Sequence, residues 1–335
     1  MRPVFHPRLV NGSFEDPALY IPLTFRKQAL LFDLGDLTPL SPKDIIKLSH
    51  IFVSHTHIDH FIGFDRVLRM LLGRPKTIHL YGPRGFLTNI AGKLSSYTWN
   101  LVENYADALV VKATEISKHQ HLTQTFNCRG GFASSAIDIK ETKDAPAFQD
   151  PEFIVTTAVL DHQIPCLGFC VRERFHVNIM KARMRALGLS VGPWLTQFKR
   201  LIHEGADPAT EIEVPIDTGK PKSRTFDLEY LHREIALITP GQKTAYVADV
   251  IYSPENEARI INLAQNADHL YIEAVFLESE RQVAEAKYHL TARQAGIIAH
   301  KAGVKQMTVF HHSPRYTDHG DLLVQEAQEA FRSGE

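Results

Sequence analysis

The sequence predicts a layered α/β fold in which sheets are covered by helices. Short apolar and β-branched runs alternate along the 335 residues with stretches whose apolar residues recur at helical spacing. Hydrophobic residues make up 44% of the chain, which is enough to bury a sizeable core. Length alone allows about two domains or one large one. The pattern favours a single domain, 1–335, that carries an insertion.

The predicted strands are short runs bounded by Gly, Pro or polar residues. They are 29–33, 51–54, 77–81, 153–160, 166–171, 235–239, 244–248, 269–272 and 306–310. The runs 153–160 and 166–171 are expected to form an antiparallel pair around Pro165. The predicted helices are 62–72, 84–95, 254–266, 291–302 and 321–331.

The segment 172–226 interrupts this alternation and is predicted to be an inserted arm. Seven Lys or Arg residues but one acidic residue, Glu173, lie between positions 172 and 203, whereas 204–225 is richer in acid, Pro and Gly. Apolar residues spaced 3, 4 and 3 apart predict one face of a helix here: Val177, Met180, Met184 and Leu187. The first part of the arm is therefore expected to present a basic surface.

The overall charge excludes one class of function. With 37 basic and 38 acidic residues, the net charge of −1 rules out binding to nucleic acid through total charge, although not through a local basic patch. Three cysteines without CxxC spacing cannot form a disulfide framework. The first residues lack a signal-peptide pattern, and no apolar run approaches the length of a membrane span, about 18 residues. These features predict a cytoplasmic protein.

The strongest functional signal is the hexapeptide His55-Thr56-His57-Ile58-Asp59-His60, directly after the predicted strand 51–54. A loop at a strand end can turn alternate side chains toward one point, so His55 and His57 can converge on one ion, and Asp59 and His60 on a second. Imidazole and carboxylate without thiolate suit Zn²⁺, or Mn²⁺ and iron at a harder site. The alternative, a solvated polar turn, does not explain this order between a strand and a helix.

This hexapeptide resembles the signature of the metallo-β-lactamase fold hydrolases. The resemblance implies a four-layer αββα sandwich, two divalent metal ions, and further ligands at the ends of later strands. Candidates occur there in order, namely His162 for the first ion, Asp249 as a bridge and His311 for the second ion. Each residue alone is weak evidence, but the ordered set is not. The predicted metal ligands are His55, His57, Asp59, His60, His162, Asp249 and His311.

From about Leu30 to Tyr316 the chain resembles, more narrowly, the ribonuclease Z family, endonucleases that remove the 3′ trailer from precursor tRNA. The motifs that carry this resemblance are 31–36 (LFDLGD), 54–60 (SHTHIDH), 162–169 (HQIPCLGF), 186–193 (ALGLSVGP) and 311–316 (HHSPRY). The segment 186–193 resembles part of the arm with which the family grips the tRNA elbow. The resemblance implies precursor tRNA as the RNA partner, and a homodimer, because family members commonly pair.

The sequence departs from the family around the expected acid–base residues. The family's His-Glu-Ala-Thr segment is 272–275 here and begins with Ile272, so a histidine that the resemblance implies in proton transfer is replaced. The companion histidine remains as His289. Asp249 is flanked by Ala and Val instead of the family's Gly and Thr. The metal set is therefore expected to be intact while the groups that assist proton transfer are altered.

Candidate catalytic residues follow from the metal set and its neighbours. Asp59 is expected to ligate a metal and to orient the attacking water or accept its proton. Glu273 is expected to steer His289, which would be the remaining general acid, unless His289 is a plain surface residue. Asp33 is either a hydrogen-bond partner of a ligating histidine or a turn-forming residue before Gly35.

Substrate contacts are expected from the arm and from the last motif. Lys199 and Arg200 would bind RNA phosphates, Arg315 would assist them, and Trp194 and Phe198 would be available to stack on bases. The alternative for the arm is a solvated amphipathic helix that docks on the body of the protein.

The leading interpretation is a binuclear metal-dependent phosphodiesterase, similar to ribonuclease Z, that cleaves RNA. One alternative is a hydrolase of small phosphodiesters or other esters, with no role in tRNA processing. Another is a non-enzymatic RNA-binding protein with a structural metal site, which a complete two-ion ligand set disfavours.

Overall fold

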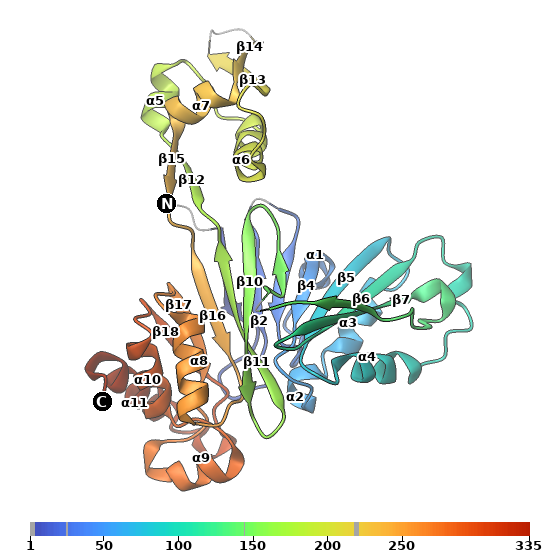
Figure 1. The fold of residues 1–335 in the computed structure, drawn as a ribbon, viewed down its shortest axis with the longest axis vertical. Coiled ribbons are helices and arrows are strands. Elements are labelled where there is room, and N and C mark those ends of the chain that lie inside the picture. Colours follow the sequence, from blue (N-terminus) through green and yellow to red (C-terminus); the bar gives the residue numbers. More distant parts are fainter. Residues whose placement is uncertain (1–3, 25, 144, 218–220) are drawn as a thin grey trace. The chain divides into compact units, whose positions relative to one another are not determined.

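The computed structural model describes residues 4–24, 26–143, 145–217 and 221–335, which form two compact units (Figure 1). The larger unit comprises 5–147, 155–171 and 243–335. The smaller unit comprises Val4, 148–154 and the described residues of 172–242, so it contains the predicted arm and continues to Gln242. No helix in the described ranges combines the length and apolar character that crossing a membrane requires.

The first sheet has eight strands in the order β1-β2-β3-β4-β5-β6-β7-β8. They are β1 (Arg8–Leu9), β2 (Leu19–Pro22), β3 (Ala29–Phe32), β4 (Leu48–Phe52), β5 (Lys76–Gly82), β6 (Leu109–Ile116), β7 (Gln120–Asn127) and β8 (Asp138–Glu141). The strands β3 to β6 are parallel, and the outer pairs are antiparallel. Parallel pairing requires crossovers, supplied by α1 (Pro42–Lys47), α2 (Ile58–Phe61), α3 (Phe64–Leu71) and α4 (Phe86–Ser95).

The second sheet has the order β18-β17-β16-β11-β10-β9. Its strands are β9 (Phe148–Gln149), β10 (Phe153–Asp161), β11 (Pro165–Glu173), β16 (Lys243–Val247), β17 (His269–Glu273) and β18 (Met307–Phe310). β16, β17 and β18 are parallel. The helices of this half are α8 (Pro254–Ala264), α9 (Arg281–Lys287), α10 (Ala292–Lys301) and α11 (Gly320–Ser333).

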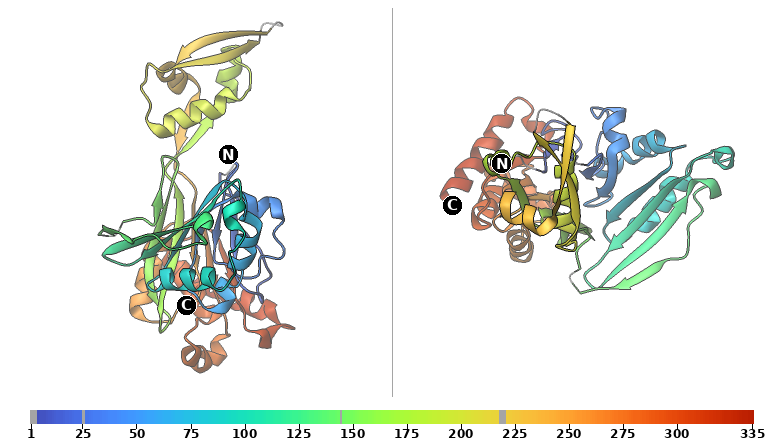
Figure 2. Two further views of the ribbon diagram at one scale, coloured as in Figure 1. Left: turned by 90° about the vertical axis from the view of Figure 1, so that its right-hand side faces the viewer. Right: turned by 90° about the horizontal axis from the view of Figure 1, so that it is seen from above.

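Aromatic side chains pack the two sheets against each other in the larger unit. The rings of Phe32 and Phe52 lie 5.7 and 5.6 Å from the ring of Phe169 on β11. The strand neighbours Leu31 and Ile51 point the other way, into an apolar cluster with α3 and α4. A second cluster joins β16–β18 to α8, α10 and α11. Helices thus cover the outer face of each sheet (Figures 1 and 2), and the predicted αββα sandwich is confirmed.

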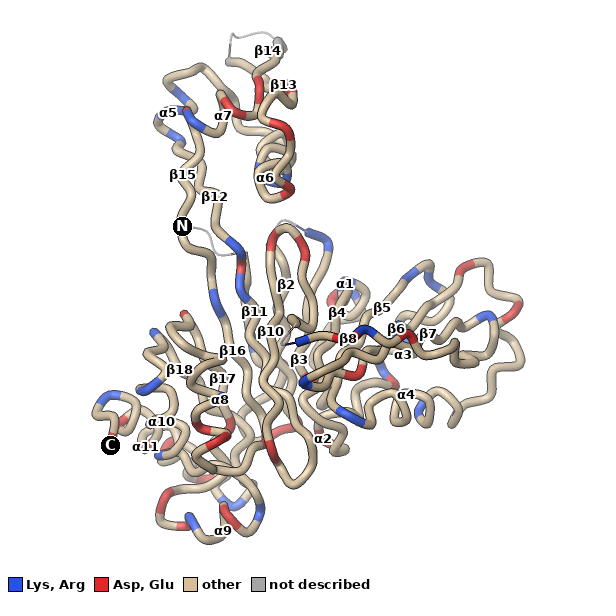
Figure 3. The backbone as a smooth tube through the Cα atoms, in the orientation of Figure 1, with Lys and Arg blue, Asp and Glu red and all other residues tan. Residues whose placement is uncertain are grey.

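The smaller unit has an apolar core of its own. β12 (His176–Ile179) pairs antiparallel with β15 (Ala236–Thr239), and β13 (Glu211–Asp217) pairs antiparallel with β14 (Pro221–Asp227). The helices α5 (Lys181–Ala186), α6 (Trp194–Glu204) and α7 (Leu228–Ile235) pack around the apolar cluster. Basic residues lie on α5 and α6, and acidic residues on β13 and α7, although α6 also carries Glu204 and α7 carries Arg233 (Figure 3).

Two expectations for the arm are wrong. Val177 does not lie on a helix face, because it belongs to β12 and the helix begins only at Lys181. Trp194 and Phe198 are 5% and 0% exposed and form part of the core, so neither ring is available to stack on a base. Apolar spacing alone did not distinguish a strand followed by a short helix from one longer helix.

Candidate metal centre

The predicted metal ligands lie at the carboxyl ends of strands in the larger unit. The hexapeptide 55–60 follows β4, and its second half enters α2, with His57 as the residue that precedes the helix. His162 follows β10, Asp249 follows β16 and His311 follows β18. Because β16 and β18 run parallel in one sheet, the residues that follow them emerge at the same edge.

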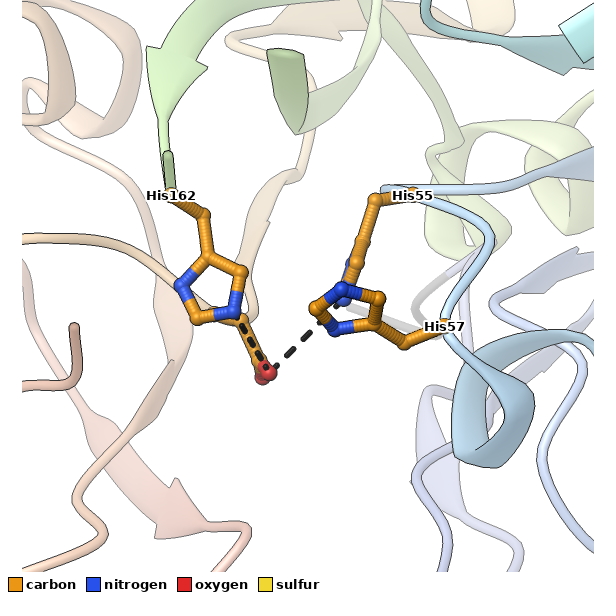
Figure 4. Close-up of side chains that lie close together, drawn as sticks. His55, His57 and His162 are labelled. Carbon is orange, nitrogen blue, oxygen red and sulfur yellow. Dashed lines mark ion pairs between the residues drawn. The ribbon is translucent and has the colours of Figure 1, made fainter. Parts of the chain in front are cut away.

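His55, His57, His162 and Asp249 form a first group, with ligand atoms all within 4.8 Å of one another. The rings of His55 and His57 lie 4.4 Å apart, and each lies 5.3 Å from the ring of His162 (Figure 4). Asp249 Oδ2 lies 3.8 Å from His55 Nε2 and 3.6 Å from His162 Nε2. Three imidazoles and one carboxylate oxygen therefore surround a single point.

Asp59, His60 and His311 form a second group within the same limit of 4.8 Å. Asp59 Oδ2 lies 3.4 Å from His60 Nε2 and 3.2 Å from His311 Nε2. Asp249 Oδ1 lies 3.3 Å from His60 Nε2 and 2.9 Å from His311 Nδ1. The two oxygens of Asp249 thus face different groups, which is the arrangement of a bridging carboxylate.

This donor set fits two divalent ions. Ligand bonds of about 2.1 Å in tetrahedral geometry place donor atoms about 3.4 Å apart, which matches the separations around Asp249. Within the described part of the chain, four buried atoms at the site lack a hydrogen-bond partner: His55 Nε2, His60 Nε2, Asp249 Oδ1 and His311 Nδ1. Leaving a polar atom buried and unpaired costs about 1–3 kcal/mol. Coordination of metal ions would satisfy all four.

The electrostatic field at the site favours positive charge. Burial by itself disfavours positive charge, and it lowers the pKa of His55. At His311 burial acts in the same direction, but Asp249 and Asp59 outweigh it and raise the pKa to about 10. Burial opposes ionisation of Asp249, yet the neighbouring histidines hold its pKa well below the usual range. The carboxylates therefore stabilise a cation at this position.

Asp33 fixes the orientation of His60. Its carboxylate is fully buried, and its Oδ2 lies 2.9 Å from His60 Nδ1. It also accepts hydrogen bonds from the Ser54 amide, the Ser54 hydroxyl and the Tyr246 hydroxyl, at 2.6, 2.8 and 2.8 Å. Burial lowers the pKa of His60, but Asp249 and Asp33 outweigh this and raise it well above its usual value. The sequence left two roles open for Asp33, and in the structure Asp33 is the hydrogen-bond partner of a candidate ligand, His60.

Glu273 and His289 lie beside the two groups, with ligand atoms close to those of Asp249 and His311. Glu273 is fully buried, its Oε1 accepts a hydrogen bond from the Val250 amide at 2.7 Å, and its Oε2 lies 2.9 Å from His289 Nδ1. Burial lowers the pKa of His289, but Glu273 and Asp249 raise it by more, so that the net shift of this pKa is upward. Because Nδ1 faces Glu273, Nε2 is the nitrogen that remains for a substrate.

Ile272 faces away from this pair. Successive side chains of a strand point to opposite faces, and Ile272 is completely buried in the apolar cluster with Val247 and Val309, its partners in register on β16 and β18. A histidine at this position would face the helices that cover the sheet. The departure from the family pattern at Ile272 therefore leaves the contact between Glu273 and His289 intact.

Two of the predicted substrate-binding residues, Lys199 and Arg200, lie far in sequence from the metal groups, whereas Arg315 shortly follows His311. Lys199 and Arg200 are on α6 of the smaller unit, where Arg200 Nε lies 3.7 Å from Glu204 Oε1. Arg315, in the larger unit, pairs with Glu280, and its guanidinium lies 5.3 Å from the centre of the Phe276 ring. Each arginine therefore already has an acidic partner.

Some residues that build the site were missed by the sequence analysis. Ser54 and Tyr246 hold Asp33, and the Tyr288 carbonyl accepts a hydrogen bond from His162 Nδ1 at 2.9 Å. The position of Ser54 inside the matched motif was an available signal. A backbone carbonyl leaves no signal in the sequence, because any residue supplies one.

The fold and the site define a class, namely metallo-β-lactamase fold chains with a ligand set for two metal ions. Among solved structures, the chain is similar to the metallo-β-lactamase fold protein YhfI from Bacillus subtilis, with a TM-score of 0.54, 16% identity and coverage of 98% of this chain and 94% of that chain. It is also similar to the short form of human tRNase Z, with a TM-score of 0.52, 17% identity and coverage of 93% of each chain. At these identities the likeness establishes the fold.

No family model matches the chain. Among curated proteins it is similar to ribonuclease Z of Deinococcus radiodurans, at 29% identity over 296 residues that cover 86% of this chain and 83% of the relative. It is also similar to ribonuclease Z of Bacteroides fragilis, at 29% identity over 287 residues that cover 85% and 78%. The resemblance to ribonuclease Z that the motifs indicated is thus confirmed over most of the chain.

Proposed function

We propose that the chain is a metal-dependent phosphodiesterase of the ribonuclease Z type, which cuts RNA endonucleolytically and removes the 3′ trailer of precursor tRNA. The observation that carries the proposal is the Asp249 carboxylate, whose two oxygens face two separate groups of histidine ligands. The similarity to ribonuclease Z over most of the chain supplies the substrate class.

Seven residues would hold the two ions, which we take to be zinc. His55, His57 and His162 would serve the first ion, Asp59, His60 and His311 would serve the second, and Asp249 would contribute one oxygen to each. When bound, such ions polarise a phosphoryl oxygen and make water a competent nucleophile near neutral pH. Zinc suits the imidazole-rich donor set, although manganese or iron would also fit a site with these carboxylates.

The chain's own residues would direct the proton transfers. The Asp59 side chain is 33% exposed, so it can orient an entering water and accept its proton. Glu273 orients His289 through Nδ1 and favours its protonated form, which leaves Nε2 to donate a proton to the departing ribose oxygen. Positioned acids of this kind contribute about 10²–10⁴-fold to rate.

The RNA partner would be contacted by the arm and by the last motif. Arg200, with 60% of its side chain exposed, is the stronger candidate for a phosphate contact, and Lys199 and Arg315 are weaker ones. The buried rings of Trp194 and Phe198 contribute nothing to base stacking. The proposal includes a cytoplasmic location, which agrees with three free, buried cysteines. The homodimer stays a prediction, and light scattering would test it.

A second candidate function is hydrolysis of small phosphodiesters or other esters by the same metal site. It is favoured by one specific observation, that the aromatic residues of the arm are buried and leave it without a stacking surface at Trp194 or Phe198.

The test compares a precursor tRNA with bis-p-nitrophenyl phosphate, each with added Zn²⁺, with added Mn²⁺ and after chelation. We expect cleavage of both substrates, loss of both activities on chelation, and restoration by metal. If the protein hydrolyses the aryl ester but leaves precursor tRNA uncut, the second candidate function replaces the leading one. Full activity after complete removal of metal would contradict both.

A further inference from the structure

Tyr288 has a backbone conformation that usually belongs to glycine. It follows α9 with φ 65° and ψ 37°, in the left-handed region, where a side chain is disfavoured. A helix end commonly uses a left-handed residue, and glycine is the usual choice. The end of α9 therefore explains the conformation of Tyr288 but not its aromatic ring.

The main chain at Tyr288 is held by the metal site. Its carbonyl accepts the hydrogen bond from His162 Nδ1 at 2.9 Å, and the amide of the following residue, His289, donates to the Ala284 carbonyl at 2.9 Å. Both bonds are made by the backbone and would form with any residue at 288. The site thus requires this backbone position and places no demand on the side chain.

The ring of Tyr288 lies beside the first metal group and is partly exposed to solvent. It is 40% exposed, and it meets the ring of His162 edge to face, with centroids 6.5 Å apart and planes at 89°. Its hydroxyl makes no hydrogen bond to any residue that the structure describes. Two more apolar side chains next to candidate ligands are also exposed, Ile58 at 76% and Ile164 at 37%. A disfavoured residue that exposes an aromatic ring next to a reactive centre suggests a substrate contact.

We propose that Tyr288 is a specificity-determining residue, whose ring stacks on a nucleobase that flanks the cleaved phosphodiester bond. The inference rests on the proposed function and names what the site recognises beyond the phosphate. Every base has a π face, so such a contact favours nucleotides over simple phosphate esters without selecting a sequence. Stacking on a protein ring is worth about 5- to 100-fold in binding of each base.

The experiment measures kcat/KM for a short RNA with one cleavage site, prepared intact and with an abasic nucleotide on either side of the bond. The unmodified protein should prefer the intact RNA to one abasic form by about 5- to 100-fold. Tyr288→Gly should bring this ratio close to one, while Tyr288→Phe, which keeps the ring, should retain it. Tyr97→Leu is the control, because Tyr97 is equally exposed, at 44%, but adjoins no ligand in sequence. Metal content of each variant reports whether His162 is still held.

A preference that Tyr288→Gly retains, with metal still bound, would overturn the proposal. If the unmodified protein cuts no RNA but hydrolyses aryl phosphodiesters, the proposed function fails and the stacking is judged separately. The same variants are then compared on thymidine 5′-(p-nitrophenyl phosphate) and methyl p-nitrophenyl phosphate. Preference for the nucleoside ester that disappears in Tyr288→Gly supports stacking on a base, and equal preference in both proteins refutes it.

Discussion

Replacing Asp33 with asparagine should weaken metal binding by the second group while leaving the shape of the site almost unchanged. The Asp33 carboxylate receives the Ser54 amide on Oδ1 and the Ser54 hydroxyl, the Tyr246 hydroxyl and His60 Nδ1 on Oδ2. An asparagine side chain must present its NH₂ group to one of these two sides. Neither orientation satisfies all of the donors.

If the NH₂ group faces the Ser54 amide, two donors meet and one stays unpaired, at a cost of about 1–3 kcal/mol. If it faces His60, then Nδ1 must accept and the proton moves to Nε2, the nitrogen that points toward Asp249 and the metal group. Either outcome disturbs the residue that orients a ligand, and such changes typically weaken metal binding by about 10–100-fold. We therefore expect Asp33→Asn to lose about one of its two ions under chelator competition.

The assay titrates zinc against a coloured chelator and separately follows urea unfolding in excess chelator, so that metal affinity and chain stability are measured apart. Asp36→Asn is the matched control, since Asp36 lies three residues away, is exposed, and accepts hydrogen bonds from Thr38 instead of a candidate ligand. Wild-type zinc affinity in Asp33→Asn would refute the role that we assign to this carboxylate.

Other predictions follow from the same geometry. Asp249→Ala should lose both ions and all hydrolysis, because the two oxygens of Asp249 face both groups, whereas His57→Ala should chiefly weaken binding of the first ion. Metal analysis that shows two tightly bound ions in Asp249→Ala would contradict the bridging role. Ile272→His should lower the free energy of unfolding by about 1–3 kcal/mol, because it buries a polar ring in an apolar cluster. A gain in RNA cleavage without loss of stability in urea would instead show that the side chain at position 272 reaches the metal site. Arg200→Ala should reduce the salt dependence of RNA binding by about one unit of logarithmic slope, while the exposed Arg332→Ala should leave it unchanged; equal slopes for both variants would assign Arg200 to a solvated face.

Local patterns in the sequence determined much of the fold and part of the site. The alternation of strands and helices predicted a layered α/β fold, because each element carries its own apolar period, and the resemblance to a known family implied the αββα sandwich. The hexapeptide 55–60 runs from the loop after β4 into the first residues of α2, so its ligands are brought near one another by local geometry alone. His162, Asp249 and His311 could be named as well, because each follows a strand and matches a motif in the expected order.

Tertiary structure alone decided how these residues act, because the deciding contacts join positions far apart in the chain. The two oxygens of Asp249 divide between the metal groups only when β16, β18, β10 and the loop after β4 come together. Strand register puts Ile272 on the apolar face and Glu273 on the other, and the packing of the smaller unit buries Trp194. A sequence specifies the type and order of side chains, but the face on which each one lies and the atom that it meets depend on register and packing, which no local pattern encodes.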